Sequence, residues 1–160
     1  MLPLLFLDVD GPLIPFGGAD HPTYGPMSAT SDTNPLLARI NPALGPRLLA
    51  LPCEPVWATT WGEDANAEVA PRLGLPELPV LGWEDGGRPQ GPLHWKTRPI
   101  VAWAGGRPFV WIDDEIGERD RSWVVENHPG PALLLRVAPE AGLTEDDLAA
   151  VGRWLAELDR

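Results

Sequence analysis

A short apolar run near the N-terminus ends in two carboxylates and a tight turn, and no other feature constrains the fold as strongly. Residues 4–9 are apolar except for Asp8, and Asp10 follows before Gly11 and Pro12. A strand without polar alternation is buried on both faces, which is typical of parallel sheets covered by helices. We therefore predict a central parallel strand over residues 4–9 that delivers Asp8 and Asp10 to one edge of a sheet.

Further apolar segments alternate with helical patterns along the rest of the chain. Additional strands are predicted at residues 55–59, 78–81, 108–112 and 132–137, of which 78–81 is the weakest because prolines flank it. Helices are predicted at 42–51, 64–73, 95–104, 120–126 and 145–158, with Gly74 ending the second and Thr144 capping the last. This alternation predicts an α/β fold of three layers, doubly wound and Rossmann-like, with a mostly parallel five-stranded sheet.

Size and composition limit the class of protein. The 160 residues suit one domain over 1–160, and 44% hydrophobic content with eight Trp argues against disorder. The single Cys53 excludes an internal disulfide. A net charge of −11 argues against a broad nucleic-acid or anionic-membrane surface. Without a signal peptide or an apolar run long enough for a membrane span, the expected location is cytoplasmic, and no pattern indicates an oligomeric state.

The predicted strand ends bring acids, hydroxyls and the single lysine to one edge of the sheet. Ligands of parallel α/β sheets bind at the carboxyl ends of the strands. The residues expected there are Asp8, Asp10, Thr59, Thr60, Asp113 and Asp114, together with Lys96 at the start of the helix before the fourth strand. So many carboxylates need compensation, most simply from Mg²⁺. Together with the positive charge of Lys96, such a cation would allow this edge of the sheet to bind a phosphate group.

These residue types suit phosphoryl transfer. One carboxylate can attack phosphorus to form an aspartyl phosphate, and a second can carry the proton that the leaving group needs. The Thr59 hydroxyl and Lys96 are candidates to bind phosphoryl oxygens. Lys96 is the only lysine among twelve basic residues, and its compact ammonium can contact a carboxylate and a phosphoryl oxygen where a planar guanidinium would not fit.

The same residues resemble the four motifs of the haloacid dehalogenase (HAD) superfamily. The matching segments, in the family's order, are Asp-Val-Asp-Gly at 8–11, Thr59, Lys96 and the acidic pair at 113–114. More narrowly, segments 56–61, 95–97 and 111–115 resemble the HAD-like domain of bacterial Swiss-army-knife RNA-repair proteins. One departure is Pro12, which stands where the family usually has Thr or Val and removes an N–H from the turn.

The resemblance implies a role for each residue. Asp8 would be the nucleophile and a metal ligand, and Asp10 would be the general acid/base with its backbone carbonyl on Mg²⁺. Lys96 would bridge the nucleophile and the phosphoryl group. Two alternatives stay open: Thr59, which directly follows the strand, or Thr60 as phosphoryl ligand, and Asp113 or Asp114 as the direct metal ligand.

The segments between the motifs, 12–55 and 61–95, are too short for an independent cap domain, so the resemblance implies an open, capless site. The expected function is that of a Mg²⁺-dependent phosphomonoesterase acting through an aspartyl phosphate on Asp8. Its phosphorylated substrate would be a small molecule, a nucleotide or a nucleic-acid end. The alternatives are a phospho-acceptor module and a catalytically silent phosphate-binding domain. A phospho-acceptor of the receiver type would carry the acidic pair on its first strand, whereas here the pair comes last.

Other residues near the motifs are candidates for contact with a substrate. Trp57, Trp61 and Trp95 are candidates for stacking on a base or an aryl group, although tryptophans in small domains more often pack in the core. Asn66 is a candidate for substrate contact. Glu115 and Asp120 are expected to be solvated or to compensate a helix dipole, and no histidine is expected to take part in chemistry.

Overall fold

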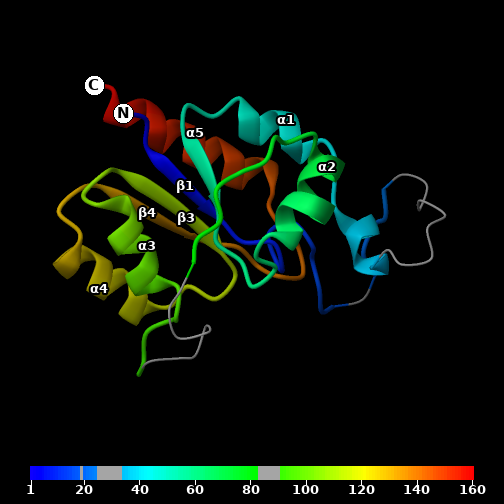
Figure 1. Cartoon of the computed structure of the whole chain (residues 1–160), viewed down its shortest axis with the longest axis horizontal. Coiled ribbons are helices and arrows are strands. Elements are labelled where there is room, and N and C mark those ends of the chain that lie inside the picture. Colours follow the sequence, from blue (N-terminus) through cyan, green and yellow to red (C-terminus); the bar gives the residue numbers. More distant parts are fainter. Residues whose placement is uncertain (19, 25–33, 83–90) are drawn as a thin grey trace.

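The computed structural model describes residues 1–18, 20–24, 34–82 and 91–160, and a parallel sheet of four strands lies at its centre (Figure 1). The order across the sheet is β2-β1-β3-β4, and every neighbouring pair is parallel. The strands are β1 (Leu4–Leu7), β2 (Glu54–Trp57), β3 (Phe109–Asp113) and β4 (Ala132–Arg136). The predicted central strand is therefore confirmed, with β1 between β2 and β3.

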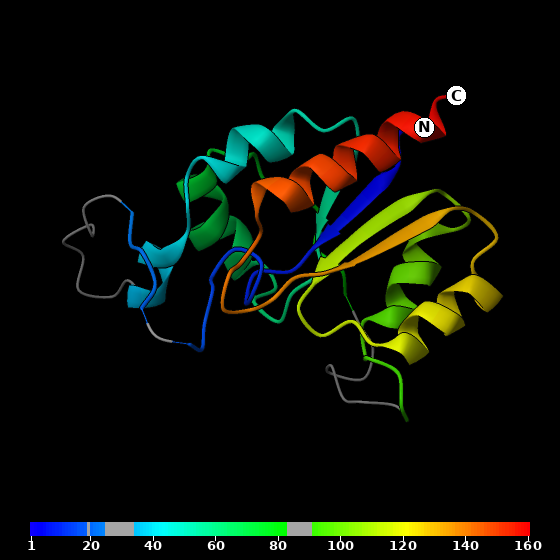
Figure 2. The same ribbon diagram turned by 180° about the vertical axis from the view of Figure 1, so that it is seen from behind.

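Helices cover both faces of the sheet (Figures 1 and 2). One face carries α1 (Leu44–Leu49), α2 (Ala70–Leu73) and α5 (Glu145–Leu158), and the other carries α3 (Thr97–Ala104) and α4 (Glu118–Asn127). Alternate residues of β1 serve the two cores, with Leu5 and Leu7 packing toward α5 and Leu4 and Phe6 toward α3. The three-layer arrangement predicted from the alternating pattern is thus confirmed.

The predicted fifth strand at residues 78–81 is reduced to a single bridge. Val80 pairs with Trp57 alone, through the Trp57 N–H to Pro79 O and the Leu81 N–H to Trp57 O. Pro76 and Pro79 have no N–H to donate, so the segment is not suited to a longer ladder. In the described residues the sheet therefore has four strands, not five.

The helix predicted over residues 64–73 has two parts. A π-helical turn, η2 (Ala65–Val69), precedes α2, and the Ala70 N–H donates to Ala65 O. Pro71 follows at once and lacks an N–H, which favours a wider turn before it. Gly74 ends α2 with φ 69°, as predicted. The predicted cap of α5 is also confirmed, because Thr144 and Asp147 exchange hydrogen bonds between side chain and backbone.

The segments that would hold a cap domain contain only short elements where they are described. Between β1 and β2 these are a 3₁₀ helix, η1 (Pro35–Arg39), and α1. Residues 25–33 and 83–90 lie outside the described residues, so the absence of a cap and the single-domain organisation remain predictions. Among the helices that are described, none combines the length and the apolar character of a membrane span.

Candidate active site

The site is built around Lys96, which lies between two aspartates from neighbouring strands. Its Nζ is 3.1 Å from Asp8 Oδ1 and 2.7 Å from Asp113 Oδ2. Asp8 directly follows β1, Asp113 ends β3, and Lys96 precedes the first residue of α3. All three are nearly buried, with 6%, 1% and 3% of their surfaces exposed. The tertiary structure therefore brings together the first, third and fourth predicted motifs.

Burial and charge set the protonation of this triad. Burial raises the pKa of Asp8 to about 8, although Lys96 acts to lower it. Burial also acts to raise the pKa of Asp113, but Lys96 and the Glu115 N–H outweigh it and hold that pKa below its usual value. The two carboxylates together raise the pKa of Lys96 against the effect of burial. Lys96 is therefore a firmly charged ammonium, whereas Asp8 is easily protonated when no further cation is near.

Asp114 completes an acidic group with Asp8 and Asp113. One carboxylate oxygen from each of the three lies within 4.8 Å of the others. Burial and the neighbouring Asp113 raise the pKa of Asp114 to about 6. Gly11 makes this approach possible, because a Cβ at its position would lie 2.8 Å from Asp114 Cγ. The glycine of the first motif thus allows the fourth motif to pack against it.

This group fits a hard divalent cation. Its donors are carboxylate oxygens, which Mg²⁺ prefers, and three carboxylates lie close together with the single ammonium of Lys96 beside them. The carboxylate of Asp10 does not belong to this group of three. Any contribution of Asp10 to a cation would therefore come through its backbone carbonyl, as the family resemblance implies.

Asp10 lies at the rim of the site and is held by a tryptophan. The Trp61 indole Nε1 donates a hydrogen bond to Asp10 Oδ2 at 3.2 Å. Asp10 is half-buried, unlike Asp8, which is 6% exposed. Two aspartates only two residues apart therefore have different partners and different access to solvent.

The two candidate threonines also differ. Thr59 is fully buried, and its Oγ1 accepts the Trp61 backbone N–H at 3.2 Å, which leaves the hydroxyl hydrogen free to donate elsewhere. Thr60 is exposed. The geometry favours Thr59 as a phosphoryl ligand, in line with its place directly after the apolar strand.

A buried acid that the sequence reading missed supports the Lys96 segment. Asp120 is 3% exposed and accepts hydrogen bonds from His94 N, the Thr97 hydroxyl and Gly117 N. It joins the loop after β3 to the start of α3. Of the two roles expected for Asp120, burial excludes the solvated one, whereas its place in the first turn of α4 agrees with compensation of the helix dipole. Its position three residues after Gly117, at the first turn of α4, is the sequence signal that could have indicated a buried capping role.

His94 belongs to the same support. Its Nδ1 accepts the Lys96 backbone N–H at 3.1 Å, and its Nε2 lies 2.8 Å from Glu115 Oε2. Glu115 is therefore paired, although its side chain is largely exposed as expected. His94 thus helps to fix the backbone that presents Lys96.

Two other candidates have structural partners. The Asn66 amide accepts hydrogen bonds from Trp57 Nε1 and Leu78 N and donates to Leu78 O, which uses its polar atoms within the fold. Trp57 is fully buried and therefore does not present a face for stacking. Neither residue contributes a free group to the site.

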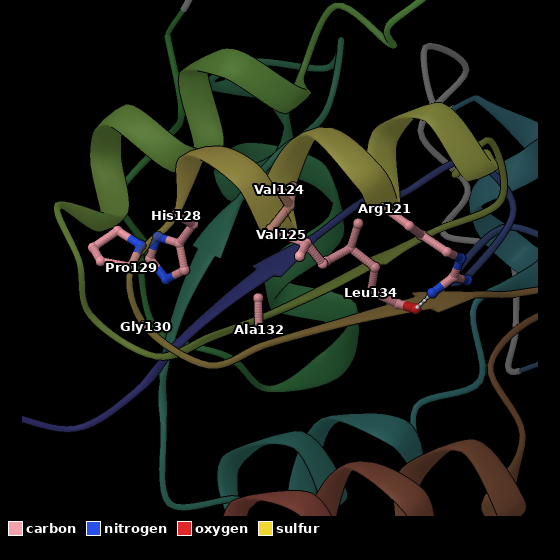
Figure 3. A pocket seen from close by; sticks show the side chains of 8 residues that line it. All are labelled: Arg121, Val124, Val125, His128, Pro129, Gly130, Ala132 and Leu134. Atoms are coloured by element: carbon pink, nitrogen blue, oxygen red, sulfur yellow. Dashed lines mark hydrogen bonds between the residues drawn. The ribbon is translucent and has the colours of Figure 1, made fainter.

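A hollow elsewhere on the molecule has no carboxylate among the described residues of its lining (Figure 3). It has a volume of about 420 Å³ and lies between α4 and β4. Val124, Val125, Ala132 and Leu134 contribute much of its lining, and Arg121 at one end donates to Leu134 O at 2.6 Å. The acidic group at the carboxyl ends of β1 and β3, and not this hollow, is the candidate active site.

Comparison with known families agrees with the geometry. Residues 4–148 match the family described as "HAD domain in Swiss Army Knife RNA repair proteins". HAD domains are in general phosphatases and typically use Mg²⁺. Comparisons with curated proteins and with solved structures gave no match. The matched region contains every residue of the triad and of the acidic group, and the chain therefore belongs to the family of HAD domains found in Swiss Army Knife RNA repair proteins.

Proposed function

We propose that this domain is a Mg²⁺-dependent phosphomonoesterase that works through an aspartyl phosphate on Asp8. The observation that carries the proposal is the nearly buried triad, in which one ammonium contacts both Asp8 and Asp113 beside Asp114. An ammonium at this position can contact a phosphoryl oxygen while it stays close to the attacking carboxylate.

In the first half of the proposed reaction, an ionised Asp8 carboxylate oxygen attacks phosphorus. The Asp8 oxygen–phosphorus bond forms as the bond from phosphorus to the leaving-group oxygen breaks, and Asp10 gives its proton to that oxygen. Lys96 and the Thr59 hydroxyl hold the phosphoryl oxygens during the transfer. Asp10 suits the proton transfer because it lies at the rim, two residues from the nucleophile and outside the contacts of Lys96.

In the second half, water attacks the phosphorus of the aspartyl phosphate. Asp10, now ionised, takes the proton from that water, and the acyl–phosphate bond breaks to restore the Asp8 carboxylate and release inorganic phosphate. One residue can thus serve as acid and then as base without a second proton carrier.

The proposed metal site consists of Asp8, Asp113, Asp114 and the Asp10 carbonyl. A bound Mg²⁺ would neutralise negative charge on the carboxylates and on the phosphoryl oxygens. The proximity of three carboxylate oxygens, two of them on residues with raised pKa values, supports this assignment.

As substrate we propose a terminal phosphate on a nucleotide or on a nucleic acid. The family description, which places such domains in RNA repair proteins, supports this class. Arg136 supplies a local positive charge, because it ends β4 beside Asp113 and its Nε donates to Asp114 O at 3.2 Å. In the described part of the chain no carboxylate forms an ion pair with Arg136. We therefore propose that Arg136 contacts a second phosphate of such a substrate, despite the net charge of −11.

The test is phosphate release from an aryl phosphate and from a 5′- or 3′-phosphorylated oligoribonucleotide, with Mg²⁺ and with chelator. We expect Mg²⁺-dependent release that Asp8→Asn lowers by at least about 10³-fold, whereas the exposed control Asp159→Asn leaves it unchanged. Arg136→Ala should lower kcat/KM for the oligoribonucleotide and leave the aryl phosphate unaffected. Phosphorylation of Asp8 without turnover would instead indicate a phospho-acceptor. Release that Asp8→Asn does not change would refute the nucleophile.

A further inference from the structure

Trp61 connects two parts of the candidate active site through its two N–H groups. Its backbone N–H donates to Thr59 Oγ1, and its indole Nε1 donates to Asp10 Oδ2, each at 3.2 Å. The residue follows β2 at the rim and is partly buried against the core on the α5 side of the sheet. No other described side chain donates a hydrogen bond to the Asp10 carboxylate.

An indole N–H is a donor only. It can therefore hold one carboxylate oxygen in place without competing for the proton that Asp10 has to carry. With Oδ2 bound to Trp61, the other oxygen is left to exchange a proton with the leaving group or with water. A carboxylate on a half-buried turn would otherwise rotate, and proton transfer requires a heavy-atom distance of about 2.6–3.2 Å.

We propose that Trp61 is a positioning residue that orients Asp10 for proton transfer, an inference that rests on the proposed function. Through its backbone, the same residue holds Thr59 in the geometry that leaves the hydroxyl hydrogen free for a phosphoryl oxygen. Trp61 thus acts by orienting side chains, not by stacking on a base.

The variant Trp61→Phe isolates the proposed contact. It keeps the backbone N–H that binds Thr59 and most of the ring that packs on the core, and it removes the indole N–H. The matched control is Trp154→Phe, because Trp154 is also partly buried against the same core but lies in α5.

The kinetic test compares esters whose leaving groups differ in their need for a proton. Alkyl phosphates need an acid, whereas nitrophenyl phosphates lose a stable anion without one. We expect Trp61→Phe to lower kcat/KM, which reports the steps up to the aspartyl phosphate, about 10-fold on the alkyl ester and less than about 2-fold on the nitrophenyl ester. The effect should vanish when Asp10 is already Asn, because the two residues act as one unit. Equal losses of kcat/KM on both esters, or additive losses with Asp10→Asn, would overturn the proposal. A rise in KM confined to nucleotide substrates would instead indicate stacking and would also overturn it.

A spectroscopic measurement separates this proposal from the proposed function. The Trp61 indole N–H resonance, assigned by its loss in Trp61→Phe, should shift and exchange faster with water in Asp10→Ala. An unchanged resonance would refute the contact whether or not the protein is an active phosphatase. If the resonance responds and the wild type hydrolyses no ester, the proposed function fails while the Trp61–Asp10 contact stands.

Discussion

Polar side chains are buried in two regions of the molecule, and the regions differ in how those side chains are partnered. At the carboxyl edge of the sheet, Asp8, Lys96, Asp113 and Asp120 are nearly buried, and each has at least one charged or hydrogen-bonded partner. Beside the hollow between α4 and β4, His128 is buried to a similar degree, yet neither ring nitrogen has a hydrogen-bond partner among the residues that the structure describes. Its ring packs edge-on against Phe109 at 4.8 Å.

The difference follows from the cost of burying charge. A buried carboxylate or ammonium must be paired, whereas histidine can lose its proton and pack as a largely apolar ring. Burial accordingly lowers the pKa of His128. The region with paired charges contains carboxylates and an ammonium that can act on a phosphate group, and the described lining of the hollow has no such cluster. The choice of the sheet edge as the candidate site therefore rests on its paired buried charges and not on the volume of a hollow.

The largest expected effect comes from removing the central cation. Lys96→Met leaves Asp8 and Asp113 buried without their partner, which should cost about 3–5 kcal/mol of unfolding free energy. Urea denaturation with chelator at pH 7 measures this cost. Arg47→Met, which breaks the exposed ion pair with Glu145, should cost less than about 1 kcal/mol. Equal losses of unfolding free energy in the two variants would show that burial does not increase the contribution of the Lys96 ion pairs to stability.

A smaller effect is expected at the support of the Lys96 segment. Asp120→Ala removes the acceptor for His94 N, Gly117 N and the Thr97 hydroxyl and should cost about 2–3 kcal/mol. Asp120→Asn keeps one acceptor oxygen and should cost less. Phosphatase activity should fall in the same order, because the backbone before Lys96 loses its anchor. If Asp120→Ala unfolds at the same urea concentration as wild type, Asp120 does not hold this junction.

The smallest effect is expected beside the hollow. His128→Leu should change the unfolding free energy at pH 7.5 by less than about 1 kcal/mol, because no hydrogen bond is lost. The folded pKa of His128 is lowered from 6.5, so the unfolded chain binds more protons as the pH falls. The wild type therefore loses stability below about pH 6.5 in a way that the variant does not. Thermal denaturation at pH 7.5 and 5.0 checks this, and a variant that loses as much stability as the wild type between these two pH values would contradict it.

Much of the fold could be predicted because strands and helices are encoded in local patterns. The strand predicted at 4–9, the Thr144 cap and Gly74 at the end of α2 each depend on neighbouring residues. The cap and the helix end were predicted correctly, and β1 covers residues 4–7 of the predicted strand. The segment at 78–81 was predicted to be a full strand because local pattern does not measure ladder length. Its pairing depends on hydrogen bonds to β2, which is distant in the sequence, and only Val80 forms a bridge to that strand.

The same limit applies to the candidate site. The ends of the predicted strands indicated where Asp8 and Asp113 would lie, because the carboxyl ends of parallel strands share one edge of the sheet. The partners of Asp10 and Asp120 were not predictable, because Trp61 reaches Asp10 over 51 positions and Asp120 reaches His94 over 26. Such contacts depend on how loops pack, and no local pattern specifies that.

The sequence by itself determined the alternation of elements, the order of the four motifs and the acidic character of the sheet edge, because these follow from residue types and short-range periodicity. Only the tertiary structure decided which carboxylates share Lys96, which threonine is buried and which acid Trp61 holds. Burial and hydrogen bonding between distant segments set these properties, and through them the pKa values of Asp8, Asp113 and Asp114.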